Sequence, residues 1–172
     1  MKRKQHDEEP LTEEAKLLID YLEQYSNCKD KQARLESRRK AIIKEFDNPL
    51  SSVNYDGMPK GNSISVGAAS LAYRLDEIDS RILQQQNRAA KFLLEVMSVL
   101  EFLPENELER DVLEARYIDC YTWSKTCSAV HLSRSAAYKY LKDGLNKLLT
   151  YKKVQKIIQD HKARLIDEGV CL

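Results

Sequence analysis

The segment "TWSKTCSAVHLSRSAAYKYLKDGL", residues 122–145, decides the fold of the C-terminal part of the chain. It contains two short runs of helical periodicity, which meet at the tripeptide "HLS", residues 131–133. Thr122 precedes the first run and Ser133 precedes the second, and both residue types are common caps of helix N-termini. The segment therefore predicts two short helices joined by a tight turn, which is the helix-turn-helix arrangement.

The apolar residues of this segment predict how the two helices pack. At about 100° per residue, one face of the first helix carries Trp123, Thr126, Cys127 and Val130, and Leu132 fills the turn. The stripe expected to be buried on the second helix consists of Ala137, Leu141, Gly144, Leu145 and Leu148. Because Ala137 and Gly144 are small, they allow the neighbouring helices to approach closely.

The opposite face of the second helix is polar and basic. Helix-turn-helix proteins place such a face in the major groove of DNA, and the free backbone N–H groups of the first helical turn bind phosphate. This face carries Ser135, Lys139, Lys142 and Asn146, flanked by Arg134 and Tyr138. We therefore predict DNA contacts by Arg134, Ser135, Tyr138, Lys139, Lys142 and, on the first helix, Lys125.

Basic charge is concentrated in the same region. Residues 122–164 contain ten Lys and Arg side chains against two acidic ones, Asp143 and Asp160, so this region has a net charge of +8, whereas the whole chain has +1. Such segregation is typical of a domain that binds nucleic acid. The alternative interpretation is a solvated basic face on a small helical bundle that binds another protein.

Residues 11–104 predict a long antiparallel, coiled-coil-like helical hairpin, so the whole chain is expected to be all-α. Thr12 is expected to cap the first helix, Asn48-Pro49 to end it and Pro104 to end the second. Each helix carries a seam of apolar residues at alternating spacings of three and four, with a few polar members. The seams are Leu18, Tyr21, Tyr25, Cys28, Gln32, Leu35, Arg39, Ile42 and Phe46, and Leu71, Leu75, Ile78, Ile82, Gln85, Ala89, Phe92, Val96, Val99 and Leu103.

Four parts are predicted along the chain. A flexible N-terminus, residues 1–10, precedes the hairpin of residues 11–104, which contains a loop at 48–65. The helix-turn-helix domain covers residues 105–150 and begins with a helix at 107–118. The last part, residues 151–172, is a helical extension that either continues the preceding helix or folds back as a fourth helix of the domain.

The sequence carries no pattern typical of an active site, a cofactor site or a metal site. The three histidines are far apart, and the four cysteines form no CxxC pair. We therefore expect no enzyme activity, no cofactor, no metal and reduced cysteines. A signal peptide and an apolar run of about 18 residues are also missing, so we expect a cytoplasmic protein without a membrane partner.

Two stretches resemble known families. Residues 109–148, "ERDVLEARYIDCYTWSKTCSAVHLSRSAAYKYLKDGLNKL", are similar in layout to the helix-turn-helix of sigma factors that reads the promoter −35 element. "VNYDGMPKGN", residues 53–62, resembles the loop between the long helices of ArpU/RinA-type phage late-gene transcriptional regulators of Gram-positive hosts. The resemblance implies a phage or prophage activator of late genes with a recognition helix at 133–142. Thr126 and His131 depart from the pattern, in which an aliphatic residue and Gly are usual.

This reading leads us to expect a protein associated with the nucleoid of a bacterial host, in which the hairpin forms a homodimer or contacts host RNA polymerase. One alternative is a small terminase-like DNA-packaging subunit, which also joins a helix-turn-helix to oligomerising helices. Another is a coiled-coil adaptor that binds only protein. The sequence leaves open the operator, the oligomeric state, the choice between activation and repression, and the roles of the loop and of the extension after Leu149.

Overall fold

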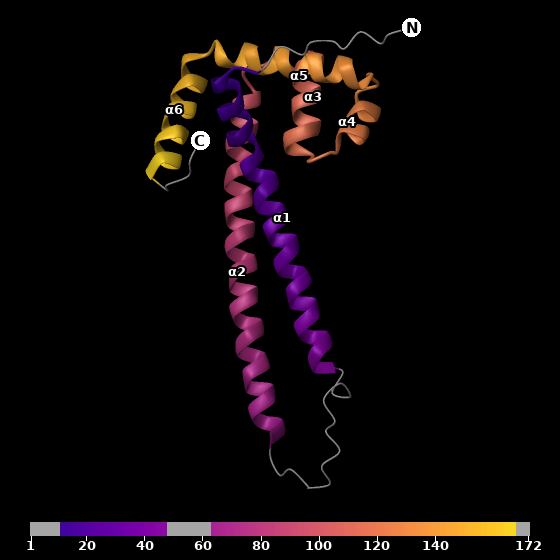
Figure 1. The fold of residues 1–172 in the computed structure, drawn as a ribbon, viewed down its shortest axis with the longest axis vertical. Coiled ribbons are helices and arrows are strands. Elements are labelled where there is room, and N and C mark those ends of the chain that lie inside the picture. Colours follow the sequence, from indigo (N-terminus) through magenta and orange to yellow (C-terminus); the bar gives the residue numbers. More distant parts are fainter. Residues whose placement is uncertain (1–10, 48–62, 168–172) are drawn as a thin grey trace, which may run out of the picture. The chain divides into compact units, whose positions relative to one another are not determined.

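The computed structural model describes residues 11–47 and 63–167, apart from the side chains of residues 47 and 63–68. Within these residues the chain forms helices and turns, which confirms the predicted all-α fold. The elements, in chain order, are α1 (Glu13–Asp47), α2 (Ser63–Leu100), α3 (Leu108–Leu113), the π-helix η2 (Glu114–Ile118), α4 (Trp123–Ala129), α5 (Arg134–Leu149) and α6 (Lys152–Asp167) (Figure 1).

Helices α1 and α2 form the predicted antiparallel hairpin. The hydroxyl of Tyr21 donates a hydrogen bond of 3.3 Å to the Glu95 carboxylate. Further along, the Arg39 guanidinium donates two hydrogen bonds to Asp79, at 2.6 and 3.2 Å. Residue numbers therefore rise along α1 while those of their partners fall along α2, which fixes one register for the pair.

The predicted seams face the partner helix. Every seam member is buried or half-buried except Phe46, which is 46% exposed. The polar members Gln32, Arg39 and Gln85 are half-buried, so their long side chains cover the seam with their apolar stems while their polar ends reach its edge. The heptad pattern thus predicted the paired faces along both helices.

The predicted helix ends are partly correct. The Thr12 hydroxyl accepts a hydrogen bond from the Ala15 N–H at 3.2 Å, so Thr12 caps α1. Helix α2 begins at Ser63, inside the predicted loop, since residues 63–65 contain no helix-breaking Gly or Pro. It ends at Leu100 rather than at Pro104. The residues before a proline disfavour the α conformation, and the Leu103 N–H bonds instead to the Leu100 carbonyl three residues back.

The predicted N-terminus 1–10, the "VNYDGMPKGN" loop and the last residues of the extension, 168–172, lie outside the described residues.

The single helix predicted at 107–118 is instead α3 followed by η2, in which the Asp119 N–H bonds to the Glu114 carbonyl five residues back. Apolar spacing alone cannot distinguish this wider turn from an α-helix. Of the two interpretations of the extension, the structure favours the second, because α6 is a separate helix after a turn at Thr150 and Tyr151.

Contacts between residues divide the chain into two compact units. Among the described residues, the core unit comprises residues 11–26 and 92–167, and the distal hairpin comprises residues 27–47 and 63–91. The predicted domain boundaries after residues 104 and 150 do not coincide with these divisions. The base of the hairpin, the helix-turn-helix and α6 instead belong to one unit.

The core unit is built on one apolar cluster. Residues of α1, α2, α3, η2, α5 and α6 all contribute to it, and Trp123, Val130 and Leu132 pack against it from α4 and the following turn. Burial of this many aliphatic side chains is the main stabilising contribution to such a unit. The fully or almost fully buried members are Leu18, Tyr21, Leu22, Val96, Val99, Leu100, Leu103, Val112, Leu113, Tyr117, Leu141, Leu145, Leu148, Val154 and Ile158.

A buried histidine holds α6 on α1. The His161 ring lies 2.8 Å from an Asp20 carboxylate oxygen through Nε2 and 3.1 Å from the Gln24 amide nitrogen through Nδ1. Its edge contacts the Tyr21 ring at 5.5 Å between centroids. An Nε2–H tautomer satisfies both polar contacts, because Nε2–H then donates to Asp20 while Nδ1 accepts from Gln24. The extension is thus an integral part of the core unit.

Candidate nucleic-acid interface

Side-chain caps begin both helices of the helix-turn-helix. The Thr122 hydroxyl accepts a hydrogen bond from the Lys125 N–H at 3.5 Å, and the Ser133 hydroxyl accepts one from the Ala136 N–H at 3.3 Å. Both caps have extended backbone angles, as an N-cap requires. Helices α4 and α5 therefore begin where the sequence predicted.

The turn between α4 and α5 is a Schellman-type helix end. The Leu132 N–H bonds to the Cys127 carbonyl at 3.0 Å across His131, which has φ = 53°. The left-handed conformation is easiest for Gly, which has no Cβ atom. His131 adopts this geometry, so its departure from the pattern leaves the tight turn intact.

The predicted buried stripe of α5 is confirmed. Ala137, Leu141, Gly144, Leu145 and Leu148 are the buried residues of this helix. A Cβ atom added at Gly144 would lie 2.9 Å from Leu113 Cδ1 and 3.1 Å from Glu109 Cβ, closer than side chains normally pack. Gly144 therefore allows α3 to lie directly against α5, and this packing fixes which face of α5 remains exposed.

The six predicted contact residues lie on two helices. Arg134, Ser135 and Lys139 are exposed on α5, and Tyr138 and Lys142 are half-buried on the same helix. Lys125 is exposed on α4, where its Nζ lies 3.7 Å from the centroid of the Tyr121 ring. The first two turns of α5 thus present a guanidinium, a hydroxyl, a phenol and an ammonium group.

A hollow of about 390 Å³ lies between the starts of α4 and α5. It is lined by Trp123, Arg134, Ser135 and Tyr138, so three of the predicted contact residues surround it. The Trp123 and Tyr138 rings lie 5.9 Å apart between centroids, and the Arg116 guanidinium lies 5.4 Å from the Trp123 centroid. The lining thus combines two aromatic rings with a guanidinium and a hydroxyl group.

The sequence did not indicate that Trp123 lines this hollow. Trp123 packs against the core cluster, as predicted, but it is only half-buried and also lines the hollow. Arg116 precedes the turn, and its guanidinium also donates a hydrogen bond to the Tyr121 carbonyl. The contact between Trp123 and Tyr138 depends on how α4 crosses α5, which residue spacing within either helix does not specify.

Lys147, one of the ten basic residues of the C-terminal region, forms two ion pairs. Lys147 Nζ lies 2.8 Å from a Glu107 carboxylate oxygen and 2.9 Å from one of Glu109. These hydrogen bonds raise the pKa of Lys147, and the bond from Lys147 lowers the pKa of Glu109. Lys147 therefore connects α5 to Glu109 on α3 and to Glu107, the residue that precedes α3.

Thr126 is the other residue for which the sequence analysis noted a departure from the resembling pattern. It is fully buried, and its hydroxyl has no hydrogen-bond partner among the described residues. An unpaired buried hydroxyl destabilises a fold, so an aliphatic side chain of the same size would suit this position better. The side chain lies on the packed face of α4, away from the exposed face of α5.

The described residues carry no sign of two other kinds of site. No group of three or more His, Cys, Asp or Glu side chains there has the arrangement of a metal site. No helix in this part of the chain combines the length and the apolar character needed to cross a membrane. The three cysteines that the structure describes, Cys28, Cys120 and Cys127, form no disulfide bond with one another.

Comparisons with family models, with curated proteins and with solved structures give no match to this chain.

Proposed function

We propose that the protein is a sequence-specific regulator of transcription that binds double-stranded DNA with α5 in the major groove. The observation that carries this proposal is the two-sided character of α5. Its buried stripe is packed against α3 and the core cluster, while Arg134, Ser135 and Lys139 are exposed at its start. Such a helix is fixed by packing of its buried face, and its exposed face carries hydrogen-bond donors at the N-terminal half. This arrangement suits recognition of the major groove.

The exposed groups of α5 have separate tasks in this proposal. Arg134 and the backbone N–H groups of the first turn bind a phosphate, and Lys125 on α4 binds another. Ser135 and Lys139 reach base edges, where a good contact contributes about 1–3 kcal/mol of discrimination. Tyr138 supports the strand at the hollow beside Trp123. Phosphate contacts supply most of the affinity, so binding weakens as salt is added.

The resemblances of residues 53–62 and 109–148 support a narrower form of the proposal. In that form the protein activates phage or prophage late genes at the nucleoid of a bacterial host, as a homodimer or together with host RNA polymerase. The wider proposal, DNA binding by α5, does not depend on this narrower one.

The test is selection of bound fragments from the genome that encodes the protein, followed by footprinting of the site. We expect one protected site upstream of a gene cluster. The variant Arg134→Ala/Lys139→Ala is expected to lose this protection, with an affinity lower by about tenfold or more.

The matched control is Lys152→Ala/Lys156→Ala, which removes the same charge from exposed positions on α6. It is expected to bind the selected site nearly as well as the wild type. Equal losses in the two variants would contradict recognition by α5 and indicate nonspecific attraction. Protection confined to a packaging site would favour the terminase-like alternative, and no binding at low salt would favour the protein adaptor.

A further inference from the structure

The distal hairpin carries a second concentration of positive charge, separate from the helix-turn-helix. Between residues 29 and 44, α1 has seven Lys and Arg side chains against Asp30 and Glu36. Many of these side chains are exposed, and the sequence analysis assigned them no role beyond the hairpin seam. Charge of one sign on one stretch of helix attracts an anionic partner.

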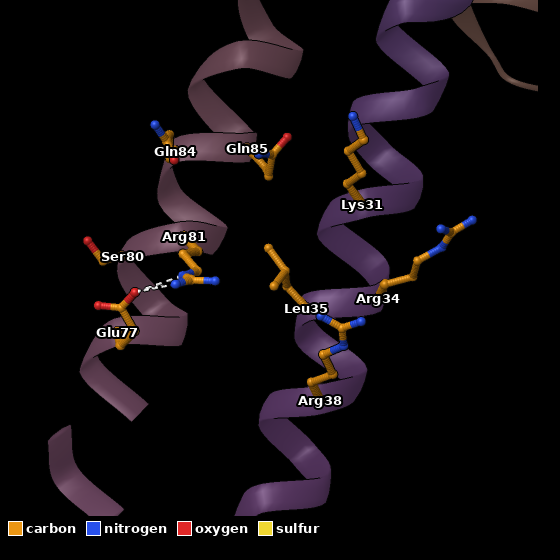
Figure 2. Close-up of a pocket in the computed structure, with 9 residues that line it drawn as sticks. All are labelled: Lys31, Arg34, Leu35, Arg38, Glu77, Ser80, Arg81, Gln84 and Gln85. Carbon is orange, nitrogen blue, oxygen red and sulfur yellow. Dashed lines mark hydrogen bonds and ion pairs between the residues drawn. The ribbon is translucent and has the colours of Figure 1, made fainter. Parts of the chain in front are cut away.

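Part of this charge lines a groove between the two helices of the distal hairpin. The groove has a volume of about 880 Å³ and its lining residues are Lys31, Arg34, Leu35, Arg38, Glu77, Ser80, Arg81, Gln84 and Gln85. Figure 2 shows Leu35 extending from α1 toward α2, and Arg81 and Gln85 extending from α2 toward α1, while Arg34 is directed away from α2. Cations thus lie both within the groove and along its α1 edge.

The cations on the α1 side are available to a ligand. Lys31, Arg34 and Arg38 are exposed, and none of them forms an ion pair with another described side chain. They follow one another along α1 over seven residues, or about 10 Å of helix. A row of this length matches a linear polyanion better than a small ligand with a single charged group.

The rest of the lining is compatible with an anion. The only carboxylate among the lining residues, Glu77, is paired with Arg81 on the same helix at 2.7 Å. Ser80, Gln84 and Gln85 supply hydroxyl and amide donors on the α2 side. Phosphate oxygens accept hydrogen bonds from these same side-chain types in protein–DNA complexes.

The lining also distinguishes between classes of partner. Leu35 is the only apolar side chain in it, and it contains no aromatic ring. Protein–protein interfaces usually have an apolar or aromatic centre, and single-stranded nucleic acid usually stacks its bases on aromatic side chains. The backbone of a duplex needs neither, because regularly spaced phosphates are bound by charge and donors alone.

We infer that this groove is a second, sequence-independent binding site for the sugar–phosphate backbone of double-stranded DNA. Lys31, Arg34 and Arg38 bind successive phosphates along one strand, and Gln84 and Gln85 donate hydrogen bonds from the other helix. The site uses residues of the distal hairpin only, so it does not depend on base recognition by α5.

The test compares two triple variants of the full chain that lose the same charge. The groove variant is Lys31→Gln/Arg34→Gln/Arg38→Gln. The control variant is Lys40→Gln/Lys44→Gln/Arg88→Gln, whose positions are exposed on the same hairpin but do not line the groove. Gln preserves helix propensity at all six positions, and circular dichroism and thermal unfolding check that both variants fold.

Binding is measured by fluorescence anisotropy with a random-sequence duplex over a series of salt concentrations. We expect the affinity of the groove variant at low salt to be lower by about tenfold or more. The magnitude of the slope of log K against log salt is expected to fall by about 2 to 3. The control variant is expected to change the slope by less than about 1. If both folded variants show the same slope of log K against log salt, the proposal is overturned. An acidic protein surface would then be the better candidate partner for the groove.

A second arm separates this site from the helix-turn-helix. The groove and control substitutions are each added to the Arg134→Ala/Lys139→Ala variant, and binding to the same random duplex is measured. We expect the groove substitutions to remove most of the remaining binding and the control substitutions to remove little. If Arg134→Ala/Lys139→Ala itself has no effect on any duplex, the proposed function fails while the groove comparison remains decisive.

Discussion

The core unit and the distal hairpin contain parts of the same two helices, yet they are stabilised differently. In the core unit the faces of α1 and α2 meet further helices, and Leu18, Val96 and Val99 have essentially no exposed surface. In the distal hairpin, the described residues belong only to α1 and α2, so each helix packs against one partner. There Leu35 and Ile78 are half-buried, and Arg39 bridges the seam to Asp79.

The difference shows what a third layer of helices contributes. A two-helix seam buries one side of each helix, so the edges of the seam remain exposed to solvent. Long polar side chains such as Arg and Gln are therefore tolerated there. Packing α3, α5 and α6 against the hairpin base closes those edges and requires apolar or small side chains. Helix α5 therefore belongs to the part of the molecule with the more deeply buried core, and the distal hairpin keeps a charged surface.

The largest expected effect is a contrast between two Leu→Ala substitutions. Leu145→Ala in the core unit is expected to lower the free energy of unfolding by about 3–4 kcal/mol, because a fully buried side chain leaves a cavity. Leu35→Ala in the distal hairpin is expected to cost only about 1 kcal/mol, since its site is open to water. Urea unfolding followed by circular dichroism measures both. Similar costs would contradict the stated difference between the units.

A smaller effect concerns alkaline pH. Burial, and then the neighbouring Glu95 carboxylate, raise the pKa of Tyr21 to about 12 from an ordinary value of 10.0. The folded chain thus holds this proton more tightly than the unfolded chain. The associated stability is complete below pH 10 and is lost as the pH rises from about 10 to 12, by on the order of 1–2 kcal/mol.

The variant Tyr21→Phe isolates this contribution. Its unfolding midpoint is expected to fall less than that of the wild type between pH 9 and pH 11.5. Part of the fall remains in the variant, because burial also raises the pKa of Tyr117. An identical pH dependence in wild type and variant would count against the contact between Tyr21 and Glu95 in the hairpin base.

A stabilising substitution is expected at Thr126. Thr126→Val keeps the shape of the side chain and removes the unpaired hydroxyl, so it should raise the free energy of unfolding by about 1 kcal/mol. Thr126→Ser is the matched control, because it keeps the hydroxyl and loses a methyl group, and it should destabilise the protein. Thermal unfolding measures both. Destabilisation by Val would indicate that the hydroxyl has a partner in solution.

The smallest expected effect is the coupling between Arg39 and Asp79 in the distal hairpin. The pair has good two-bonded geometry, but the side chains of Arg39 and Asp79 are still 39% and 48% exposed, so solvent screens the interaction. A double-mutant cycle with Arg39→Gln and Asp79→Asn is expected to give a weak favourable coupling that disappears at high salt. A coupling free energy that does not change with salt would mean that the Arg39–Asp79 pair is less exposed to solvent than the structure shows.

Periodicity predicted most of the fold. The spacing of apolar residues gave the two seams and the buried stripe of α5, and Thr12, Thr122 and Ser133 gave three helix starts. These features are local, because one helical turn or one cap determines them. The π-helical turn of η2 and the ends of α2 were missed, since a shift of one hydrogen bond leaves the apolar pattern almost unchanged.

Features that depend on crossings between helices could not be predicted. The hollow beside Trp123 and Tyr138, the pairing of Lys147 with Glu107 and Glu109, and the docking of His161 on Asp20 each join residues from different helices. The charge count likewise treated all basic residues alike. Only the structure separates Lys147, which is engaged in ion pairs, from the exposed Arg134 and Lys139.

The central claim is that α5 lies in the major groove of DNA, and contact mapping tests it most directly. A photoreactive residue is placed at position 139 on α5 or at position 162 on α6, both exposed, and each variant is irradiated with the footprinted duplex. We predict crosslinks to bases within the footprint from position 139 and few or none from position 162. Efficient crosslinking from position 162 with none from position 139 would contradict the claim.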